Sequence, residues 1–448
     1  MFLMRIFTNL KQVYSKFLKV SHKTLTSLSF LSTFFNDLSD KGSGKMILAY
    51  LSILVLEKVF QVENGVGLGS QPLSALMEEK IKTGLVPTGL ISMKGELKHS
   101  SEDGHNSMSK PLESFKSGEV KCILGHPESW LSSTAQEILT SLQSQGKILF
   151  NFVDEFQMNL SNHWGEEFRP HMKTVPGQLR ARALKGAPLL AMSATSTKSE
   201  IEELKVNLGL RDINTVVLQA NPIQSHYNYV KLKRPPNIYG SSGLDGEEEA
   251  KPGLIQLLNR LVLDEYVASI KSGENPKKTI IFFRREDDLP DVYDELCERL
   301  PGFAANPETI PWVLNHSGIG PVTAESIRQR RKSISLYLTT SVMLLGLDFD
   351  DIDVVVMVRP FNFCHYLVQA AGRGGRKMEN GVRKRVLFYL LYNNHDISRN
   401  VPGLSQAVRE FCQTDSCLKD FLRKVFGFST VAKPKAEWCC SNCLGLSS

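Results

Sequence analysis

Short runs of β-branched and aromatic residues alternate along this chain with segments of helical periodicity. Five of the runs are almost uninterrupted apolar stretches, a pattern typical of strands buried on both faces of a parallel sheet. This alternation restricts the fold to the α/β class, with helices layered on parallel sheets. The runs are KILFNFVDE, APLLAMSAT, KKTIIFFRRE, SLYLTTS and DVVVMVRP; the helical segments are MILAYLSILVLEKVF, SEIEELKVNLGL, GLIQLLNRLVLDEYVASIKSG and LPDVYDELCERL.

The alternation occurs in two series, and a chain of 448 residues is long enough for two or three domains. Between the series lies a segment rich in proline, glycine and acidic residues, a composition typical of a linker. Near residue 395 the strand-like runs end, while helical pattern and cysteines continue. The expected organisation is an irregular or divergent N-terminus over 1–38, a first domain over 39–231, a linker over 232–253, a second domain over 254–394 and a helical subdomain over 395–448.

The composition is that of an ordinary globular protein, with 42% hydrophobic and 22% charged residues. A net charge of +6 permits a phosphate-rich partner without requiring one. No stretch reaches the roughly 18 consecutive apolar residues that indicate a membrane span, so we expect no membrane partner. The first acidic residue is Asp37, and the basic start before it fits either a mitochondrial presequence or an irregular N-terminus. The cysteines cluster between Cys412 and Cys443, which favours metal binding in a reducing compartment over a disulfide framework.

A candidate phosphate loop, SDKGSGKM, spans residues 39–46 and precedes a helical segment. The backbone of Gly42, Ser43 and Gly44 could wrap phosphate oxygens, and Lys45 could reach the β and γ phosphates of a nucleotide. The next position normally carries Ser or Thr, whose hydroxyl binds Mg²⁺, but here it is Met46. The alternative is a glycine-containing loop that matches the pattern by chance.

A candidate acidic pair, Asp154 and Glu155, ends the apolar run ILFNFVDE. At the carboxyl edge of a sheet, Asp154 could hold Mg²⁺ while Glu155 orients and deprotonates an attacking water. The alternative is a helix N-terminus with two acids and no chemistry. A phosphate loop upstream and the triplet SAT, Ser193 to Thr195, after the next run favour the catalytic interpretation.

The run QAAGRGGRK, residues 369–377, has a composition that packs no core and holds two arginines at a fixed spacing. Together GSGK, VDEF, MSAT, TTSVMLLGLDFDDIDVVV and QAAGRGGRK resemble, in order, the motifs of superfamily 2 helicases. HWGEEFRP, residues 163–170, resembles the aromatic-rich loop of the RecQ helicases. CILGHPESWL and QPLSALMEEKI resemble two further motifs of that family. The resemblance extends over residues 39–445.

The resemblance implies two RecA-like lobes with ATP and Mg²⁺ between them and a small helical zinc-binding subdomain. It implies translocation on single-stranded DNA with 3′-to-5′ polarity and the unwinding of forked or branched DNA. DNA-repair proteins as partners and a nuclear location follow from the family alone.

Nucleotide-site residues of the second lobe are also implied by the resemblance. QxxGRxGR is the family's motif VI, and Gln369, Arg373 and Arg376 fit it. The two arginines would reach the γ-phosphate and stabilise transition-state charge. Gly346 and Asp348 match the family's motif V, which couples the nucleotide and DNA sites. The alternative for the arginines is a basic patch that binds nucleic acid.

Residues that couple DNA binding to hydrolysis are implied in the first lobe. In the RecQ-like loop these are Trp164, Phe168 and Arg169, because an aromatic ring can stack on a base and an arginine can pair with phosphate. Ser193 and Thr195 are expected to serve the same coupling. The alternative for Trp164 and Phe168 is a packed turn.

The cysteine cluster resembles the zinc subdomain of the RecQ family. The implied ligands are Cys417, Cys439, Cys440 and Cys443, and four thiolates suit tetrahedral structural zinc. Cys412 is a spare cysteine or an alternative first ligand, and free cysteines in a loop remain the other interpretation. Zinc would stabilise the subdomain without taking part in catalysis.

The chain departs from the family pattern in both motifs that contact the nucleotide in the first lobe. Met46 replaces the hydroxyl that binds Mg²⁺, and Gln157 replaces the histidine of the DEAH sequence. Two hypotheses follow: an active or weakened RecQ-type DNA helicase, and a catalytically impaired DNA-binding protein derived from one. An RNA helicase of the same superfamily is a third. Five residues retained from the motifs favour an enzyme: Lys45, Asp154, Glu155, Arg373 and Arg376.

Overall fold

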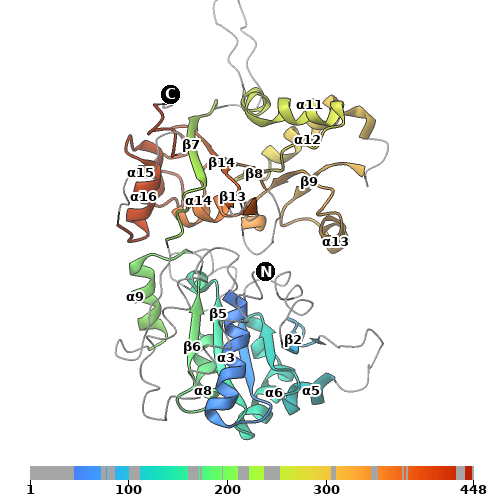
Figure 1. Ribbon diagram of the computed structural model, residues 1–448, viewed down its shortest axis with the longest axis vertical. Helices are drawn as coiled ribbons and strands as arrows, with labels where there is room; N and C mark the ends of the chain where they lie inside the picture. The colour runs from blue at the N-terminus through green and yellow to red at the C-terminus, as the bar shows by residue number, and fades with distance from the viewer. Residues whose placement is uncertain are drawn as a thin grey trace, which may run out of the picture.

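Two lobes, each built on a six-stranded sheet, stack one above the other (Figure 1). The description is of a computed structural model. Strand–helix alternation gives mainly parallel sheets in both lobes, which confirms the expected α/β class. The structure describes residues 45–71, 77, 86–99, 111–159, 171, 174–193, 195–209, 221–236, 253–303, 309–344, 352–375, 378–379, 382–429 and 439–445.

The first lobe has the strand order β3-β2-β4-β1-β5-β6, in which β2 and β3 pair antiparallel and the other pairs are parallel. All seven residues of β5, which lies between β1 and β6, are buried, as its apolar sequence predicts. The strands are β1 (Val66–Ser70), β2 (Thr88–Ile91), β3 (Leu97–His99), β4 (Cys122–Gly125), β5 (Ile148–Asp154) and β6 (Leu189–Met192).

Helices cover both faces of this sheet. One face packs Ile138 of α6 and Leu179 of α8 against Val66 and Ile123. The other packs α3 against Phe150 and its neighbours. The helices are α3 (Lys45–Phe60), α5 (Pro111–Ser117), α6 (Ser133–Ser144), α8 (Val175–Arg182) and α9 (Lys198–Asn207), with 3-10 turns η1 (Glu128–Leu131) and η2 (Phe156–Asn159).

The second lobe has the strand order β7-β14-β11-β8-β10-β9, and every pair in this sheet is parallel. The strands are β7 (Tyr227–Lys233), β8 (Thr279–Phe283), β9 (Trp312–Asn315), β10 (Leu336–Thr339), β11 (Val354–Val358) and β14 (Val386–Tyr392). A separate two-stranded hairpin joins β12 (Met378–Glu379) to β13 (Val382–Arg383).

Helical segments of the second lobe connect these strands and then continue to the C-terminal part of the chain. They are α10 (Leu254–Leu258), α11 (Asp264–Ser272), α12 (Asp288–Arg299), α13 (Pro321–Gln329), α14 (Cys364–Ala371), α15 (Gln406–Gln413) and α16 (Leu418–Val425), with a π-turn η5 (Asn259–Leu263) and 3-10 turns η6 (Pro301–Phe303) and η8 (Ser341–Leu344).

The position of strand β7 differs from the expected boundary between the lobes. It pairs along its whole length with β14, from Tyr227 opposite Val386 to Lys233 opposite Tyr392. The expected first domain over 39–231 and linker from 232 are therefore wrong at this point, because β7 is an edge strand of the second sheet. Its partner lies far along the chain, and such a pairing leaves no local signal in the sequence.

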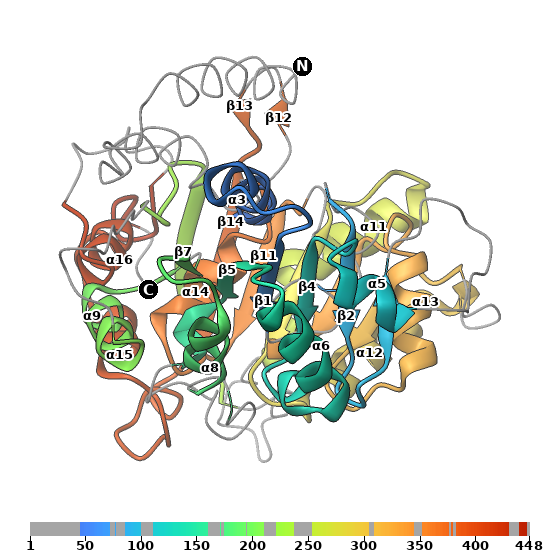
Figure 2. The same cartoon turned by 90° about the horizontal axis from the view of Figure 1, so that it is seen from below.

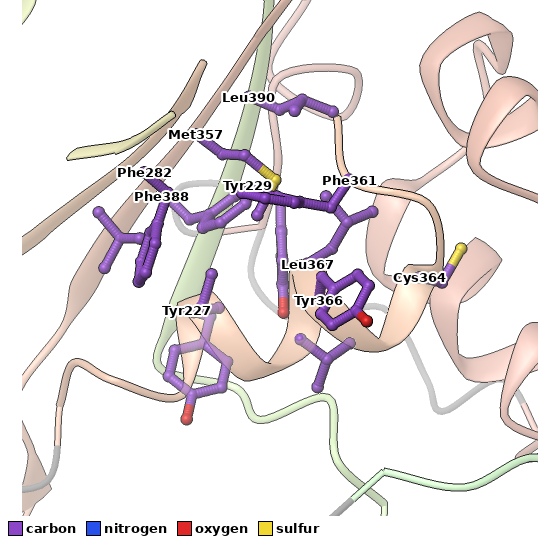
Figure 3. Close-up of a cluster of buried hydrophobic side chains, with 14 of the residues drawn as sticks. Tyr227, Tyr229, Phe282, Met357, Phe361, Cys364, Tyr366, Leu367, Phe388 and Leu390 are labelled. Atoms are coloured by element: carbon purple, nitrogen blue, oxygen red, sulfur yellow. The ribbon is translucent and has the colours of Figure 1, made fainter. Parts of the chain in front are cut away.

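The C-terminal helices share a core with the second lobe. Tyr229, Phe388, Met357 and Phe282 come from four neighbouring strands and pack against α14 (Figure 3). The same cluster includes Phe411 of α15, together with Leu418 and Leu422 of α16. The segment from residue 395 is therefore an extension of the second lobe's core rather than a body with its own.

Among the helices of the described residues, none is both long and apolar enough to cross a membrane.

Candidate nucleotide site between the lobes

The acidic pair lies at the carboxyl end of β5, as expected. Asp154 is the last residue of the strand and is only 8% exposed. Its Oδ1 accepts a hydrogen bond from the backbone N–H of Glu155 at 3.0 Å. Glu155 has a φ of 51°, in the left-handed region that side chains other than glycine rarely adopt. Such backbone strain concentrates at functional sites, where the surrounding structure maintains it.

Gln157 is a site residue that the sequence comparison identified only as a departure from the family. It lies in the turn η2 directly after the acidic pair and is almost fully buried. Its Nε2 donates to Oε2 of Glu155 at 2.6 Å. The replacement of histidine by glutamine therefore leaves a hydrogen-bond donor on the glutamate.

Ser193 and Thr195 form a local turn after β6. The Oγ of Ser193 donates to the carbonyl of Thr195 at 2.6 Å, and the N–H of Thr195 donates to that Oγ at 3.0 Å. The hydroxyl of Thr195 accepts from Nε2 of Gln369 in the second lobe at 3.3 Å, and both residues are buried. These two predicted site residues therefore meet across the lobe boundary.

Arg373 brings the second lobe to the acidic pair. It follows α14, is 9% exposed, and donates to the carbonyl of Leu344. Burial lowers the pKa of Arg373 to about 10, while the nearby Glu155 and Tyr227 act in the opposite direction. The guanidinium is therefore charged at neutral pH and interacts electrostatically with the first lobe's glutamate.

A contact between His365 and Glu200 also joins the lobes. Nε2 of His365 in α14 lies 2.9 Å from Oε2 of Glu200 in α9, and both side chains are largely buried. The ring of His365 also meets Phe426 edge-on, with 5.2 Å between ring centroids. In both views α9 lies beside α15 and α16 (Figures 1 and 2). Apart from the capping box that starts α9 at Thr197, no pattern in the sequence indicates this contact.

The four cysteines expected as ligands converge. The Sγ atoms of Cys417, Cys439, Cys440 and Cys443 all lie within 4.8 Å of one another, and those of Cys417 and Cys439 are 3.5 Å apart. Hydrogen bonds from Cys417 and Cys439 hold the pKa of Cys440 well below its usual range. Cys412 lies outside this cluster in the shared core, where burial raises its pKa to about 12.

The cysteine segment docks on the edge strand of the second sheet. The N–H of Ser441 donates to the carbonyl of Tyr229 at 2.9 Å, and the N–H of Lys231 donates to the Oγ of Ser441 at 3.3 Å. Asn442 donates to the carbonyl of Thr414 at 2.8 Å, which ties the segment to the end of α15. The cluster is thus anchored to β7.

Several predicted site residues lie outside the described residues. Lys45 begins α3, but its side chain is among those not described. The remaining ones are Gly42, Ser43, Gly44, Trp164, Phe168, Arg169, Gly346, Asp348 and Arg376.

A match to a known protein family covers much of the second lobe. Residues 256–378 match the family described as the helicase conserved C-terminal domain. A Caenorhabditis briggsae protein named as an ATP-dependent DNA helicase Q1 is 23% identical over 344 residues, which cover 73% of this chain and 48% of the relative. The chain thus spans about half the length of that relative.

Solved structures agree with the two-lobe arrangement. The DUF1998 helicase MrfA bound to DNA is 15% identical, with a TM-score of 0.56 over 89% of this chain and 50% of its own. The Mycobacterium smegmatis helicase Lhr bound to ssDNA and AMP-PNP is 16% identical, with a TM-score of 0.54 over 83% and 46%. The S. cerevisiae protein Dbp5 bound to RNA and ADP BeF3 is 14% identical, with a TM-score of 0.51 over 87% and 82%. The chain has a two-lobe, RecA-like α/β fold like that of these helicase structures, and the match to the helicase conserved C-terminal domain lies in its second lobe.

Proposed function

We propose that this protein is an ATP-dependent DNA helicase of RecQ type that moves 3′ to 5′ along single-stranded DNA and unwinds forked or branched duplexes. The observation that carries the proposal is the meeting of the two lobes at the acidic pair. Glu155 of the first lobe interacts with Arg373 of the second, and Thr195 is hydrogen-bonded to Gln369. Nucleotide hydrolysis at a lobe boundary needs an acidic pair on one side and an arginine on the other.

Each residue of this site has a distinct chemical task in the proposal. Glu155 orients the attacking water and accepts its proton, while Arg373 stabilises the charge on the transferred phosphoryl group. Asp154 would hold Mg²⁺, which supplies charge neutralisation at the phosphates. The contact between Thr195 and Gln369 makes the geometry of the site depend on how the lobes sit together.

DNA is the proposed partner on three grounds. The loop HWGEEFRP resembles that of RecQ helicases, the Caenorhabditis briggsae relative is named as a DNA helicase, and MrfA and Lhr are described as bound to DNA. Dbp5 is described as bound to RNA, so RNA is the competing partner in the test below. We propose a role with DNA-repair proteins in the nucleus, with mitochondria as the alternative that the basic N-terminus favours.

We further propose structural zinc at the cysteine cluster. A tetrahedral site with Zn–S bonds of about 2.3 Å requires sulfur atoms about 3.8 Å apart. The four Sγ atoms within 4.8 Å of one another, with one pair at 3.5 Å, fit this requirement. Thiolate ligands favour zinc over magnesium or calcium.

The second candidate function is DNA binding without turnover, and Met46 favours it. A thioether cannot replace the hydroxyl that normally ligates Mg²⁺ at this position of a phosphate loop. Losing a metal ligand that contributes several kcal/mol to the transition state would slow hydrolysis by about 10²-fold or more.

The test is the ATPase rate with and without single-stranded DNA or RNA, in the parent chain, Lys45→Ala and Met46→Ser. A helicase requires DNA-stimulated turnover that Lys45→Ala abolishes. Turnover only in Met46→Ser would identify a motor silenced at its metal site. No turnover in either, with DNA binding intact, supports the second candidate. Strand displacement from duplexes with 3′ or 5′ overhangs then tests the polarity.

A further inference from the structure

Gln157 contacts the side chain on which the proposed hydrolysis depends. Its Nε2 lies 2.6 Å from Oε2 of Glu155, a short distance for a hydrogen bond from an amide to a carboxylate. Because a carboxylate only accepts, this contact fixes which end of the amide faces Glu155. The amide is 4% exposed, so few waters compete for the bond.

The backbone around Glu155 explains why such a contact matters. The left-handed φ of 51° turns the glutamate away from the direction of β5, and the bond from its N–H to Asp154 fixes the backbone but not the side chain. A glutamate side chain loses rotamer entropy when it is fixed in one orientation. A charge-assisted hydrogen bond is strong enough to offset that loss.

We infer that Gln157 is a positioning residue that holds the Glu155 carboxylate toward the attacking water, an inference that rests on the proposed function. In this orientation the carboxylate would accept the proton of the attacking water. An amide does not titrate near neutral pH, so it donates to Glu155 throughout the working range. A histidine at this position would change its charge near pH 6.5.

The alternative is that Gln157 only fills space and satisfies its own buried amide. The two roles separate in the variant Gln157→Met, which keeps a similar volume but removes the donor. Positioning predicts a fall of about tenfold in the hydrolysis rate constant with nucleotide affinity unchanged, whereas space filling predicts no change in either.

The experiment measures single-turnover ATP hydrolysis from pH 5 to 9, together with binding of a fluorescent ATP analogue, in the full chain. For Gln157→Ala we expect the hydrolysis rate constant to fall about tenfold with nucleotide affinity within about twofold, since general-base catalysis contributes roughly 10²–10⁴ in rate. Gln157→Asn, one methylene shorter, should behave like Gln157→Ala. Circular dichroism and melting curves confirm that each variant is folded.

The outcomes distinguish the inference from the proposed function. If the parent hydrolyses ATP faster than Lys45→Ala but Gln157→Met hydrolyses it at the parent's rate, the positioning role is wrong and the helicase proposal stands. A parent chain no faster than Lys45→Ala overturns both. If Gln157→Ala does not fold, Gln157→Met decides the question alone.

Discussion

The two lobes use the carboxyl edges of their sheets differently. In the first lobe, two polar residues at or after this edge interact with the other lobe: Glu155 acts electrostatically on Arg373, and Thr195 is hydrogen-bonded to Gln369. In the second lobe, the charged residues at this edge pair with one another. Charged residues at this edge can act on a bound ligand only where they are not already paired within their own lobe.

The internal pairs of the second lobe form a buried network. Arg234, after β7, donates to both carboxylate oxygens of Asp396 at 2.8 and 2.6 Å. Arg359, after β11, donates to Asp288 at the start of α12 and lies 3.4 Å from Asp396. All four residues are less than 9% exposed, so the network joins three strand ends and a helix start away from solvent.

The largest expected effect is that of Asp396→Ala. It would leave Arg234 buried without its bidentate partner, and breaking a buried pair typically costs about 3–5 kcal/mol. Urea unfolding should show this loss in the free energy of unfolding. The matched control is Asp264→Ala, whose partner Arg299 it meets at 2.7 Å on the surface with the aspartate 58% exposed. That change should cost less than about 1 kcal/mol. Equal losses in the two variants would show that the network has no structural role.

The second-largest expected effect is that of a substitution in the cysteine cluster, which packs against the second lobe. In Cys440→Ser we expect loss of bound zinc by elemental analysis and a melting temperature lower by roughly 5–10 °C, since about 2–4 °C accompany each kcal/mol in domains of this size. Hydrogen exchange should accelerate in β7 and α16 but not in β5, because Ser441 bonds to Tyr229. Cys297→Ser, on α12 and outside the cluster, is the control. A parent chain that purifies without zinc and ignores chelators would contradict this prediction.

The sequence predicted local features well and contacts between distant segments poorly. The apolar runs predicted β5, β8, β10 and β11 because a strand buried on both faces must be apolar throughout, and they also predicted the half-buried edge strand β6. The resemblance of the cysteine segment to the RecQ zinc subdomain predicted the convergence of the four thiols. The sheet membership of β7 was not predictable, since its partner β14 is far along the chain and its own sequence mixes lysine with tyrosine.

The third prediction tests the lobe boundary directly. In His365→Asn, the hydrogen bond to Glu200 and the edge-on ring contact with Phe426 are lost. A hydrogen bond to a charged group contributes about 1.5–3 kcal/mol, so we expect the closed arrangement of the lobes to be disfavoured roughly tenfold or more. Energy transfer between dyes on α6 and α12 would report the change. His395→Asn, on the second lobe and away from α9, is the control. An unchanged transfer efficiency in His365→Asn would mean that this pair does not hold the lobes together.

The smallest effect expected is that of Thr197→Ala, and it asks whether the helix cap prepares the lobe contact. The Oγ1 of Thr197 accepts from the N–H of Glu200 at 3.3 Å, and losing such a cap typically costs about 1 kcal/mol. Glu200 Oε2 in turn accepts from the N–H of Thr197 at 2.7 Å and lies 2.9 Å from His365. Oε2 of Glu200 thus takes part both in the helix cap and in the contact with the second lobe.

A double-mutant cycle of Thr197→Ala and His365→Asn, read by the same energy transfer, separates the two roles. If the cap orients Glu200 toward the second lobe, Thr197→Ala should weaken closure in the parent and do so less when His365 is already replaced, with a coupling of at least about 0.5 kcal/mol. Additive effects would mean that α9 positions Glu200 without the cap. The closed arrangement of the lobes would then depend on packing of α9 against α16, where Lys198 lies over Gly427, rather than on the Glu200 carboxylate.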